Sequence, residues 1–133
     1  MIYLLDTQTF IWAAMKTNNL SKQGKEIIFS KTNEICVSTV SFWEISVKSK
    51  HKTFSFGDIS INDFPQYARD MDFAVIDVQE TETITFHELP EKENHKDPFE
   101  RMLIWQAITK DLTLISKDKL FKQYEENGLK LAW

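Results

Sequence analysis

Short apolar runs alternate along this chain with segments of helical spacing, and this alternation constrains the fold more than any other feature. A continuous apolar run of a few residues is typical of a strand that is buried on both faces. The predicted strands are Ile2–Leu5, Ile35–Val37, Phe73–Val78, Leu112–Ile115 and Lys130–Ala132. Strands that alternate with helices predict a three-layer α/β/α domain with a mostly parallel central sheet.

The helices expected between these strands follow from apolar spacing and from local start and stop signals. The predicted helices are Thr7–Met15, Lys22–Ser30, Thr39–Lys50, Ile61–Met71, Glu80–Glu88, Pro98–Lys110 and Lys119–Glu126. Pro65 falls inside one of them and demands a local adjustment, because proline lacks a backbone N–H. The 133 residues are expected to form a single domain, 1–133, with a substantial core.

Composition limits the classes of partner and the compartment. The formal net charge is −4, from 20 acidic and 16 basic residues. This excludes a strongly basic nucleic-acid-binding protein but not a nuclease that engages a few phosphates, and it permits a basic protein partner. No apolar run approaches the roughly 18 residues that span a bilayer, and the start, MIYLLDTQ, has no basic region of a signal peptide. With Cys36 as the single cysteine, we expect a reducing, cytoplasmic setting.

Two acidic residues come soon after predicted strands. Asp6 directly follows Ile2–Leu5, and Asp118 lies just past Leu112–Ile115. The carboxyl ends of parallel strands meet at one edge of a sheet, which is where sites form. Either residue can equally serve as the N-cap of the helix that follows it.

Two further acids open the predicted helix in HKDPFERMLI. Asp97 as N-cap, Pro98 at the first helical position and Glu100 at the third make a helix start signal. The same carboxylates can point at a metal ion, and the local sequence leaves both interpretations open.

A fifth acid lies within an apolar helix stripe in SFWEISVK. Val40, Trp43, Glu44 and Val47 follow the spacing i, i+3, i+4, i+7 and share one helix face. A carboxylate in such a stripe is unfavourable unless it is paired or bound to a metal ion. Lys48 is the alternative partner, four residues further on.

Together these acids indicate a hard metal ion. Carboxylates without His or Cys ligands suit Mg²⁺ or Mn²⁺ rather than Zn²⁺, and clustered carboxylates repel one another unless a cation lies between them. Such sites commonly serve phosphoryl chemistry. None of the three histidines has ligand spacing, although His95 lies close to the acids. The predicted ligands are Asp6, Glu44, Asp97, Glu100 and Asp118.

Several other residues have two interpretations. Ser38 and Ser41 are more simply helix caps than phosphate ligands, and Arg101 more simply forms a surface ion pair. The basic stretch Lys48–Phe54 is either a solvated helix end or an RNA-backbone contact. Core packing is the default for the four tryptophans, Trp12, Trp43, Trp105 and Trp133.

Four segments together resemble a known family. They are LLDTQTFIW, VSTVSFWEISVKSK, HKDPFERMLIWQAITKDLTLISKD and LKLAW, in family order across nearly the whole chain. The chain resembles the PIN-domain family, specifically the VapC-type ribonuclease toxins of type II toxin–antitoxin pairs. The resemblance implies a Mg²⁺- or Mn²⁺-dependent endoribonuclease that is silenced by a small antitoxin. It also implies a homodimer, for which Phe10 or Trp12 would suit an apolar patch.

The resemblance assigns the acids residue by residue. Asp6, Glu44 and Asp118 match the first, second and last family acids. The family often reads Asp-Pro-Phe-Asp-Arg at the third position, where this chain has Glu100 in place of the second Asp. The longer side chain shifts the carboxylate, so Asp97 is either an auxiliary acid or the substitute ligand.

Two other functions stay open. A catalytically impaired module that binds RNA or protein would keep the fold, and the Glu at position 100 is its best support. A metal-dependent phosphatase would need a phosphate-binding loop rich in glycine, and the three glycines, Gly24, Gly57 and Gly128, make no such loop.

Overall fold

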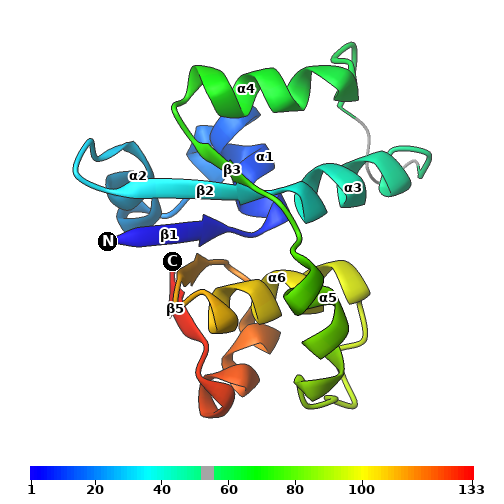
Figure 1. Ribbon diagram of the computed structural model, residues 1–133. Coiled ribbons are helices and arrows are strands. Elements are labelled where there is room, and N and C mark those ends of the chain that lie inside the picture. Colours follow the sequence, from blue (N-terminus) through cyan, green and yellow to red (C-terminus); the bar gives the residue numbers. More distant parts are fainter. Residues whose placement is uncertain (52–55) are drawn as a thin grey trace.

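A single parallel sheet organises the chain. In residues 1–51 and 56–133, which the computed structural model describes, five parallel strands pair in the order β3-β2-β1-β4-β5 (Figure 1). This confirms the predicted α/β architecture. The strands are β1 (Ile2–Leu5), β2 (Glu34–Ser38), β3 (Ala74–Ile76), β4 (Thr113–Ile115) and β5 (Lys130–Ala132).

Helices fill the connections between the strands. The α-helices are α1 (Thr7–Met15), α2 (Lys22–Phe29), α3 (Thr39–Lys48), α4 (Phe64–Asp70), α5 (Glu80–Thr85) and α6 (Pro98–Thr109). The 3₁₀ segments are η1 (Thr17–Asn19), η3 (Ile61–Asp63), η4 (Phe86–Glu88) and η5 (Lys119–Asn127). The helix predicted over 61–71 divides into η3 and α4, which is a local adjustment of the kind that Pro65 demands. Pro65 lies in the first turn of α4, where a missing N–H is tolerated.

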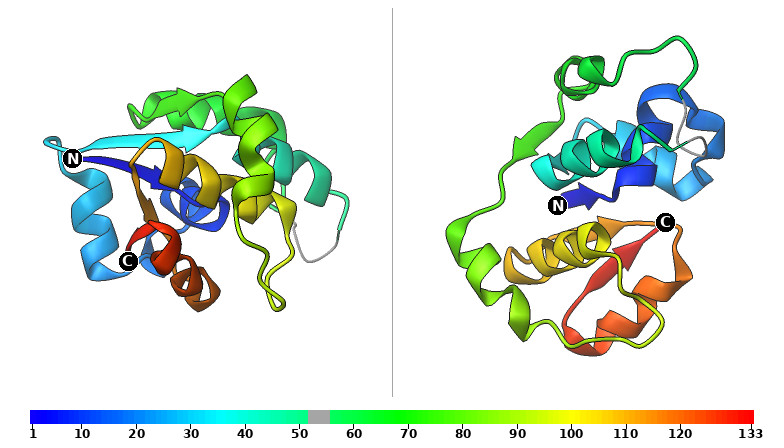
Figure 2. Two further views of the ribbon diagram at one scale, coloured as in Figure 1. Left: turned by 60° about the horizontal axis from the view of Figure 1, so that its bottom comes forward. Right: turned by 90° about the vertical axis from the view of Figure 1, so that its right-hand side faces the viewer.

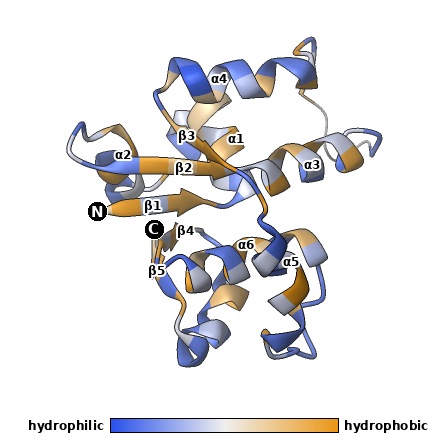
Figure 3. Cartoon of the chain, viewed as in Figure 1, coloured by the Kyte–Doolittle hydropathy of each residue, from blue (hydrophilic) through white to orange (hydrophobic). Residues whose placement is uncertain are grey.

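Alternate residues of the strands feed two separate cores. Leu5 and Val37 face the cluster that includes α1, α2 and α4, whereas Leu4 and Leu114 face the cluster that includes α6 and η5. Figure 2 shows these helices on opposite sides of the strands, and Figure 3 shows the apolar colouring of β1 and β2 between them. Burial on both faces explains why the strands are continuous apolar runs.

The strand order brings the predicted strand-end acids together. The chain crosses from β1 to β2 and β3 on one side, and β4 and β5 then pair on the other side of β1. The sheet therefore has its topological switch point between β1 and β4, where open α/β sheets form sites. The Asp6 N–H donates to the Ile115 carbonyl at 3.2 Å, which joins the carboxyl ends of these two strands.

The structure corrects two predictions about aromatic residues. Trp43 is 63% exposed, so core packing is wrong for this tryptophan; Val47 is also exposed, while Val40 and Glu44 are buried. The face of α3 that packs inward is therefore rotated from the predicted stripe. Phe10 is completely buried and cannot form an apolar surface patch.

Three further predictions concern a membrane span, the basic stretch and the single cysteine. Across the residues that the structure describes, every helix is too short or too polar to cross a membrane. Of the predicted basic stretch, Lys52–Phe54 lies outside the described residues. Cys36 is a buried free thiol in β2.

Candidate active site

Four of the five predicted acids line two cavities at the carboxyl edge of the sheet. Asp6, Glu44 and Glu100 line a cavity of about 140 Å³. Asp6 and Glu100 also line a second cavity of about 290 Å³, to which Asp118 contributes. Because Asp6 and Glu100 are common to both, the two cavities form one site around these two carboxylates.

Asp6 is held by the start of the helix that it caps. Its Oδ1 accepts a hydrogen bond of 2.8 Å from the Thr9 N–H, so the predicted N-cap is confirmed. Burial raises the pKa of Asp6, hydrogen bonds from Ser116 and Thr9 only partly oppose this, and the charge of Glu44 adds to it. The Asp6 carboxylate is therefore a buried group that a cation would stabilise.

Asp118 also lies beyond the end of a strand, past Ile115, the last residue of β4. Its Oδ1 accepts a hydrogen bond of 2.9 Å from the Leu120 N–H at the start of η5, and its own N–H donates to Ser116 Oγ at 3.0 Å. The second predicted N-cap is thus also confirmed, and capping leaves Asp118 in the lining of the larger cavity.

Glu44 reaches the site from α3 and is only 5% exposed. Its Oε2 accepts a hydrogen bond from Lys48 Nζ, which is the helical pair that the sequence offered as an alternative. Its Oε1 is buried and, among the described residues, has no hydrogen-bond partner. An orphaned buried carboxylate oxygen is costly and fits a site that receives a cation or a donor.

Lys48 links two of the acids. Its Nζ also lies 3.0 Å from Oδ2 of Asp97. Burial alone would lower the pKa of Lys48, but hydrogen bonds and charge attraction to Glu44 and Asp97 outweigh it and raise this pKa. The ammonium group therefore stays charged and supplies the local counter-charge.

Asp97 has both oxygens in use. Oδ1 accepts a hydrogen bond of 3.0 Å from the Glu100 N–H as the N-cap of α6, and Oδ2 pairs with Lys48. Burial favours a higher pKa for Asp97, but these contacts prevail and lower it. Neither carboxylate cavity is lined by Asp97.

Glu100 lies in the first turn of α6 and lines both cavities. Its Oε2 lies 2.7 Å from Nε2 of His95, so this carboxylate oxygen is engaged outside the helix start. Burial raises the pKa of Glu100; the hydrogen bond from His95 opposes this, while the charges of Asp97 and Asp118 add to it.

Sequence reasoning gave His95 no ligand role and did not find its contact with Glu100. His95 is 4% exposed and bonds on its other side to the Tyr124 hydroxyl at 2.8 Å. No spacing rule joins a histidine, a glutamate five residues later and a tyrosine 29 residues later. Only the position of His95 directly ahead of the acidic segment hinted at the contact.

Of the predictions for Ser38, Ser41 and Arg101, the first is confirmed and the other two are wrong. Ser38 caps α3, as predicted, with a hydrogen bond of 3.1 Å from the Val40 N–H. Ser41 is not a cap; its Oγ accepts a hydrogen bond of 2.9 Å from Thr7 Oγ1. Arg101 was expected in a surface ion pair, but it donates to the carbonyls of the loop before His95, those of Leu89 and Pro90, at 3.0 and 3.1 Å.

The acidic side chains have the donor atoms that a divalent cation prefers, but their present positions do not form a complete metal-binding group. Their donors are all carboxylate oxygens, as Mg²⁺ and Mn²⁺ prefer. Within residues 1–51 and 56–133, however, no group of three or more Asp, Glu, His or Cys side chains is arranged to hold a metal ion. Since Lys48 pairs with Glu44, a bound cation would have to replace or share this contact.

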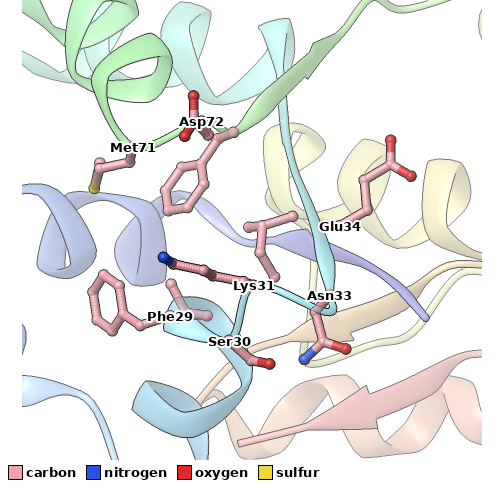
Figure 4. A pocket seen from close by; sticks show the side chains of 10 residues that line it. Phe29, Ser30, Lys31, Asn33, Glu34, Met71 and Asp72 are labelled. Atoms are coloured by element: carbon pink, nitrogen blue, oxygen red, sulfur yellow. The ribbon is translucent and has the colours of Figure 1, made fainter.

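The largest of the cavities described here lies at the opposite edge of the sheet. It measures about 600 Å³ and lies between the end of α2 and the loop that leads into β3 (Figure 4). Figure 4 shows the carboxylates of Glu34 and Asp72 turned away from each other. Their separation contrasts with the converging acids at the carboxyl edge, so the smaller cavities are the better candidates for catalysis.

Comparisons with known proteins agree with the fold. The sequence model of the PIN domain family matches residues 3–127, whereas a search of curated protein sequences gave no match. Among solved structures, the chain is similar to VapBC2 from Rickettsia felis bound to a DNA fragment from their promoter, with a TM-score of 0.69, 21% identity and coverage of 99% of this chain and 98% of that one.

Two other structures extend this likeness. DNA-bound VapBC from Salmonella typhimurium has a TM-score of 0.65 and 17% identity over 99% of this chain and 98% of that one. VapBC-5 from Mycobacterium tuberculosis, a member of the VapBC family of toxin–antitoxin systems, has a TM-score of 0.60 and 13% identity over 98% and 95%. At these identities the likeness establishes a shared fold.

Proposed function

This chain belongs to the PIN domain family, and on that premise we propose that it is a Mg²⁺- or Mn²⁺-dependent endoribonuclease. The observation that carries the proposal is the convergence of Asp6, Glu44 and Glu100 on one cavity at the carboxyl ends of the strands. Three carboxylates that share a cavity repel one another unless a cation is present. Asp118, at the neighbouring cavity, adds a fourth acid.

The residues proposed to hold the cation are Asp6, Glu44 and Glu100, with Asp118 beside them and Asp97 in support. A bound Mg²⁺ or Mn²⁺ would activate water and neutralise charge on the phosphodiester. Glu100 is preferred to Asp97 as the third ligand because both Asp97 oxygens are already engaged. Asp97 instead fixes the start of α6 and, through Lys48, the distance between α6 and α3.

The other groups at the site have supporting roles in this proposal. Thr9 holds Asp6 through its backbone N–H, and His95 holds Glu100. Lys48 lines the smaller cavity and can meet a substrate phosphate when Glu44 engages the metal ion. No protein nucleophile is required, since activated water can attack the phosphorus.

The biological setting is proposed from the same comparisons. Structures of VapBC systems share this fold, and we propose that the chain is the toxin of a toxin–antitoxin pair in the cytoplasm, with RNA as substrate and an antitoxin protein as inhibitor. A homodimer stays a prediction, and its surface must exclude Phe10, which is buried.

The test is cleavage of a mixed RNA pool by the purified chain, freed of any antitoxin, with Mn²⁺ or Mg²⁺ and then with EDTA. We expect cleavage that EDTA stops and that falls about 100-fold in Glu100→Gln, because the amide lacks the ligand's charge. Glu93→Gln makes the same chemical change at an exposed position and serves as the matched control. Cleavage that persists in EDTA would contradict the metal-dependent mechanism.

A specific observation favours a second function. Lys48 already neutralises Glu44, and the described residues contain no ready metal-binding group, as expected of a catalytically impaired PIN fold that binds RNA or protein. Metal-dependent turnover discriminates the two. A folded, antitoxin-free chain that binds RNA but cleaves none with either cation would establish the binding module.

A further inference from the structure

We propose that His95 is a positioning residue of the carboxylate site, which fixes Glu100 so that one carboxylate oxygen is presented to the metal ion. Tyr124 completes the arrangement by fixing His95. The inference rests on the proposed function, because it concerns how the chain prepares one of the proposed ligands.

The contacts form one continuous chain from the core to the cavity. The Tyr124 hydroxyl lies 2.8 Å from Nδ1 of His95, and Nε2 of His95 lies 2.7 Å from Oε2 of Glu100. Both distances are those of good hydrogen bonds. Tyr124 is fully buried and His95 nearly so, so little water competes for either bond.

The direction of the hydrogen bonds follows from the groups involved. An ionised carboxylate only accepts, so Nε2 of His95 must carry a proton and donate to Glu100. In a neutral imidazole Nδ1 is then the acceptor, and the Tyr124 hydroxyl donates to it. The carboxylate of Glu100 therefore sets the tautomer, and the Tyr124 hydroxyl, which can donate or accept, pairs with the remaining ring nitrogen and holds the imidazole in place, as outer partners of ligands do at metal sites.

The histidine ring has little freedom to turn away. Its backbone N–H donates to the Lys92 carbonyl at 3.2 Å, which fixes the turn that carries it. Its ring centroid lies 5.4 Å from that of Phe121 and 5.5 Å from that of Tyr124. Both neighbours are completely buried, so rotation of the imidazole would displace core side chains.

This rigidity has a consequence for Glu100. A glutamate has one more side-chain torsion than an aspartate and loses more entropy when it is ordered as a ligand. The bond from His95 engages Oε2, while among the described residues no hydrogen bond reaches Oε1. The residue lines both carboxylate cavities beside Asp6. His95 thus orders the longer acid before a cation arrives.

The experiment measures Mn²⁺ binding to the full chain by calorimetry, without RNA, for the wild type, His95→Leu, Glu100→Gln and the double variant. We expect His95→Leu to weaken Mn²⁺ binding about 10- to 100-fold. The double variant should bind no more weakly than Glu100→Gln alone, because His95 acts through that carboxylate. His87→Leu replaces an exposed histidine and should bind Mn²⁺ like the wild type.

Two milder variants keep the test decisive if His95→Leu fails to fold. Tyr124→Phe removes one oxygen and keeps the ring, and we expect Mn²⁺ binding to weaken severalfold. His95→Gln retains an N–H donor toward Glu100 and should bind Mn²⁺ more tightly than His95→Leu. Thermal unfolding of each variant in EDTA confirms that the compared proteins are folded.

Three results would overturn the inference. Folded His95 and Tyr124 variants that bind Mn²⁺ like the wild type would remove the positioning role. Losses that add fully in the double variant would mean that His95 acts independently of Glu100. If the wild type binds no Mn²⁺, both the proposed function and the inference fall, whereas failure of the variants alone leaves the nuclease proposal standing.

Discussion

The two helices that face the site across the cavity hold their glutamates in different ways. Glu44 on α3 pairs with Lys48, whose side chain is 29% exposed and which also reaches Asp97. Glu100 on α6 pairs with the buried ring of His95. One carboxylate therefore has a long, cationic and shared partner, and the other has a rigid aromatic one.

This difference indicates which of the two glutamates is already placed to bind a cation. The ammonium group of Lys48 neutralises Glu44, so a metal ion must compete with it. The imidazole of His95 engages only Oε2 of Glu100, so the other carboxylate oxygen of Glu100 is still available to a metal ion. The side of the site on α6, which carries Glu100, is thus already ordered, while the side on α3, which carries Glu44, must rearrange on metal binding.

The largest effect is expected at Asp6, which both sides share. Asp6→Asn should lower cleavage by about 10³-fold, because the amide lacks the charge needed to bind a cation. Asparagine caps helices as well as aspartate does, so α1 should persist. Removal of a buried charge should raise the free energy of unfolding in EDTA by about 1 kcal/mol.

Cleavage assays and urea unfolding check this prediction. Asp77→Asn, at an exposed position, is the control and should change neither quantity. An Asp6→Asn variant that cleaves RNA at the wild-type rate would show that the two sides of the site do not meet at Asp6.

The next largest effect is expected from Lys48, and it distinguishes the side of the site that carries Glu44 on α3 from the side that carries Glu100 on α6. Lys48→Met should tighten Mn²⁺ binding severalfold, because Glu44 and Asp97 lose their competing cation. The free energy of unfolding in EDTA should fall by about 1 kcal/mol, since Glu44 is left buried and unpaired while the partial exposure of Lys48 reduces the loss.

Lys50→Met removes an exposed charge just past the same helix and is the matched control for both measurements. Mn²⁺ affinity that stays at the wild-type value in Lys48→Met would contradict the argument that Lys48 competes with the metal ion. In that case the two glutamates would be equally available, and the difference between the helices would concern stability alone.

The sequence predicted the fold because each strand carries its own signal. A sheet buried on both faces needs apolar runs such as Ile2–Leu5, and helix starts need caps such as Asp6 and Asp97. The 3₁₀ character of η5 was not predicted, because its apolar spacing satisfies either helix type. Periodicity identified the faces of α3 but not which face packs inward, so the burial of Trp43 was wrong while that of Glu44 was confirmed.

The sequence predicted only those parts of the site that follow from strand ends and helical spacing. Asp6 and Asp118 follow strands that pair side by side, so their convergence follows from a parallel sheet. The residues that shift the pKa values of these acids and hold their side chains could be predicted only in part. Lys48 was foreseen because it lies one helical turn from Glu44, whereas the contact of Lys48 with Asp97 and that of His95 with Tyr124 join segments distant in sequence.

The smallest effect is a pH dependence of stability without metal. The folded-state pKa values of Asp6 and Glu100 are raised above their ordinary values of 3.8 and 4.5, chiefly by burial. Between the ordinary and raised values the folded chain binds more protons than the unfolded chain, so stability falls as pH rises through this window. Asp97 has the opposite sign: its lowered pKa contributes stability above pH 3.8 that is lost only below this value.

Urea unfolding in EDTA at pH 5 and pH 7, compared between the wild type and Glu100→Gln, tests the contribution of Glu100. The site carboxylates should make the chain more stable at pH 5 by less than about 1 kcal/mol, and Glu100→Gln should remove the part that belongs to the α6 side. Saturating Mn²⁺ should reverse the trend, because the cation binds the ionised carboxylates. If the difference between pH 5 and pH 7 is the same in the wild type and in Glu100→Gln, the α6 side does not hold an uncompensated charge, and the contrast with Glu44 disappears.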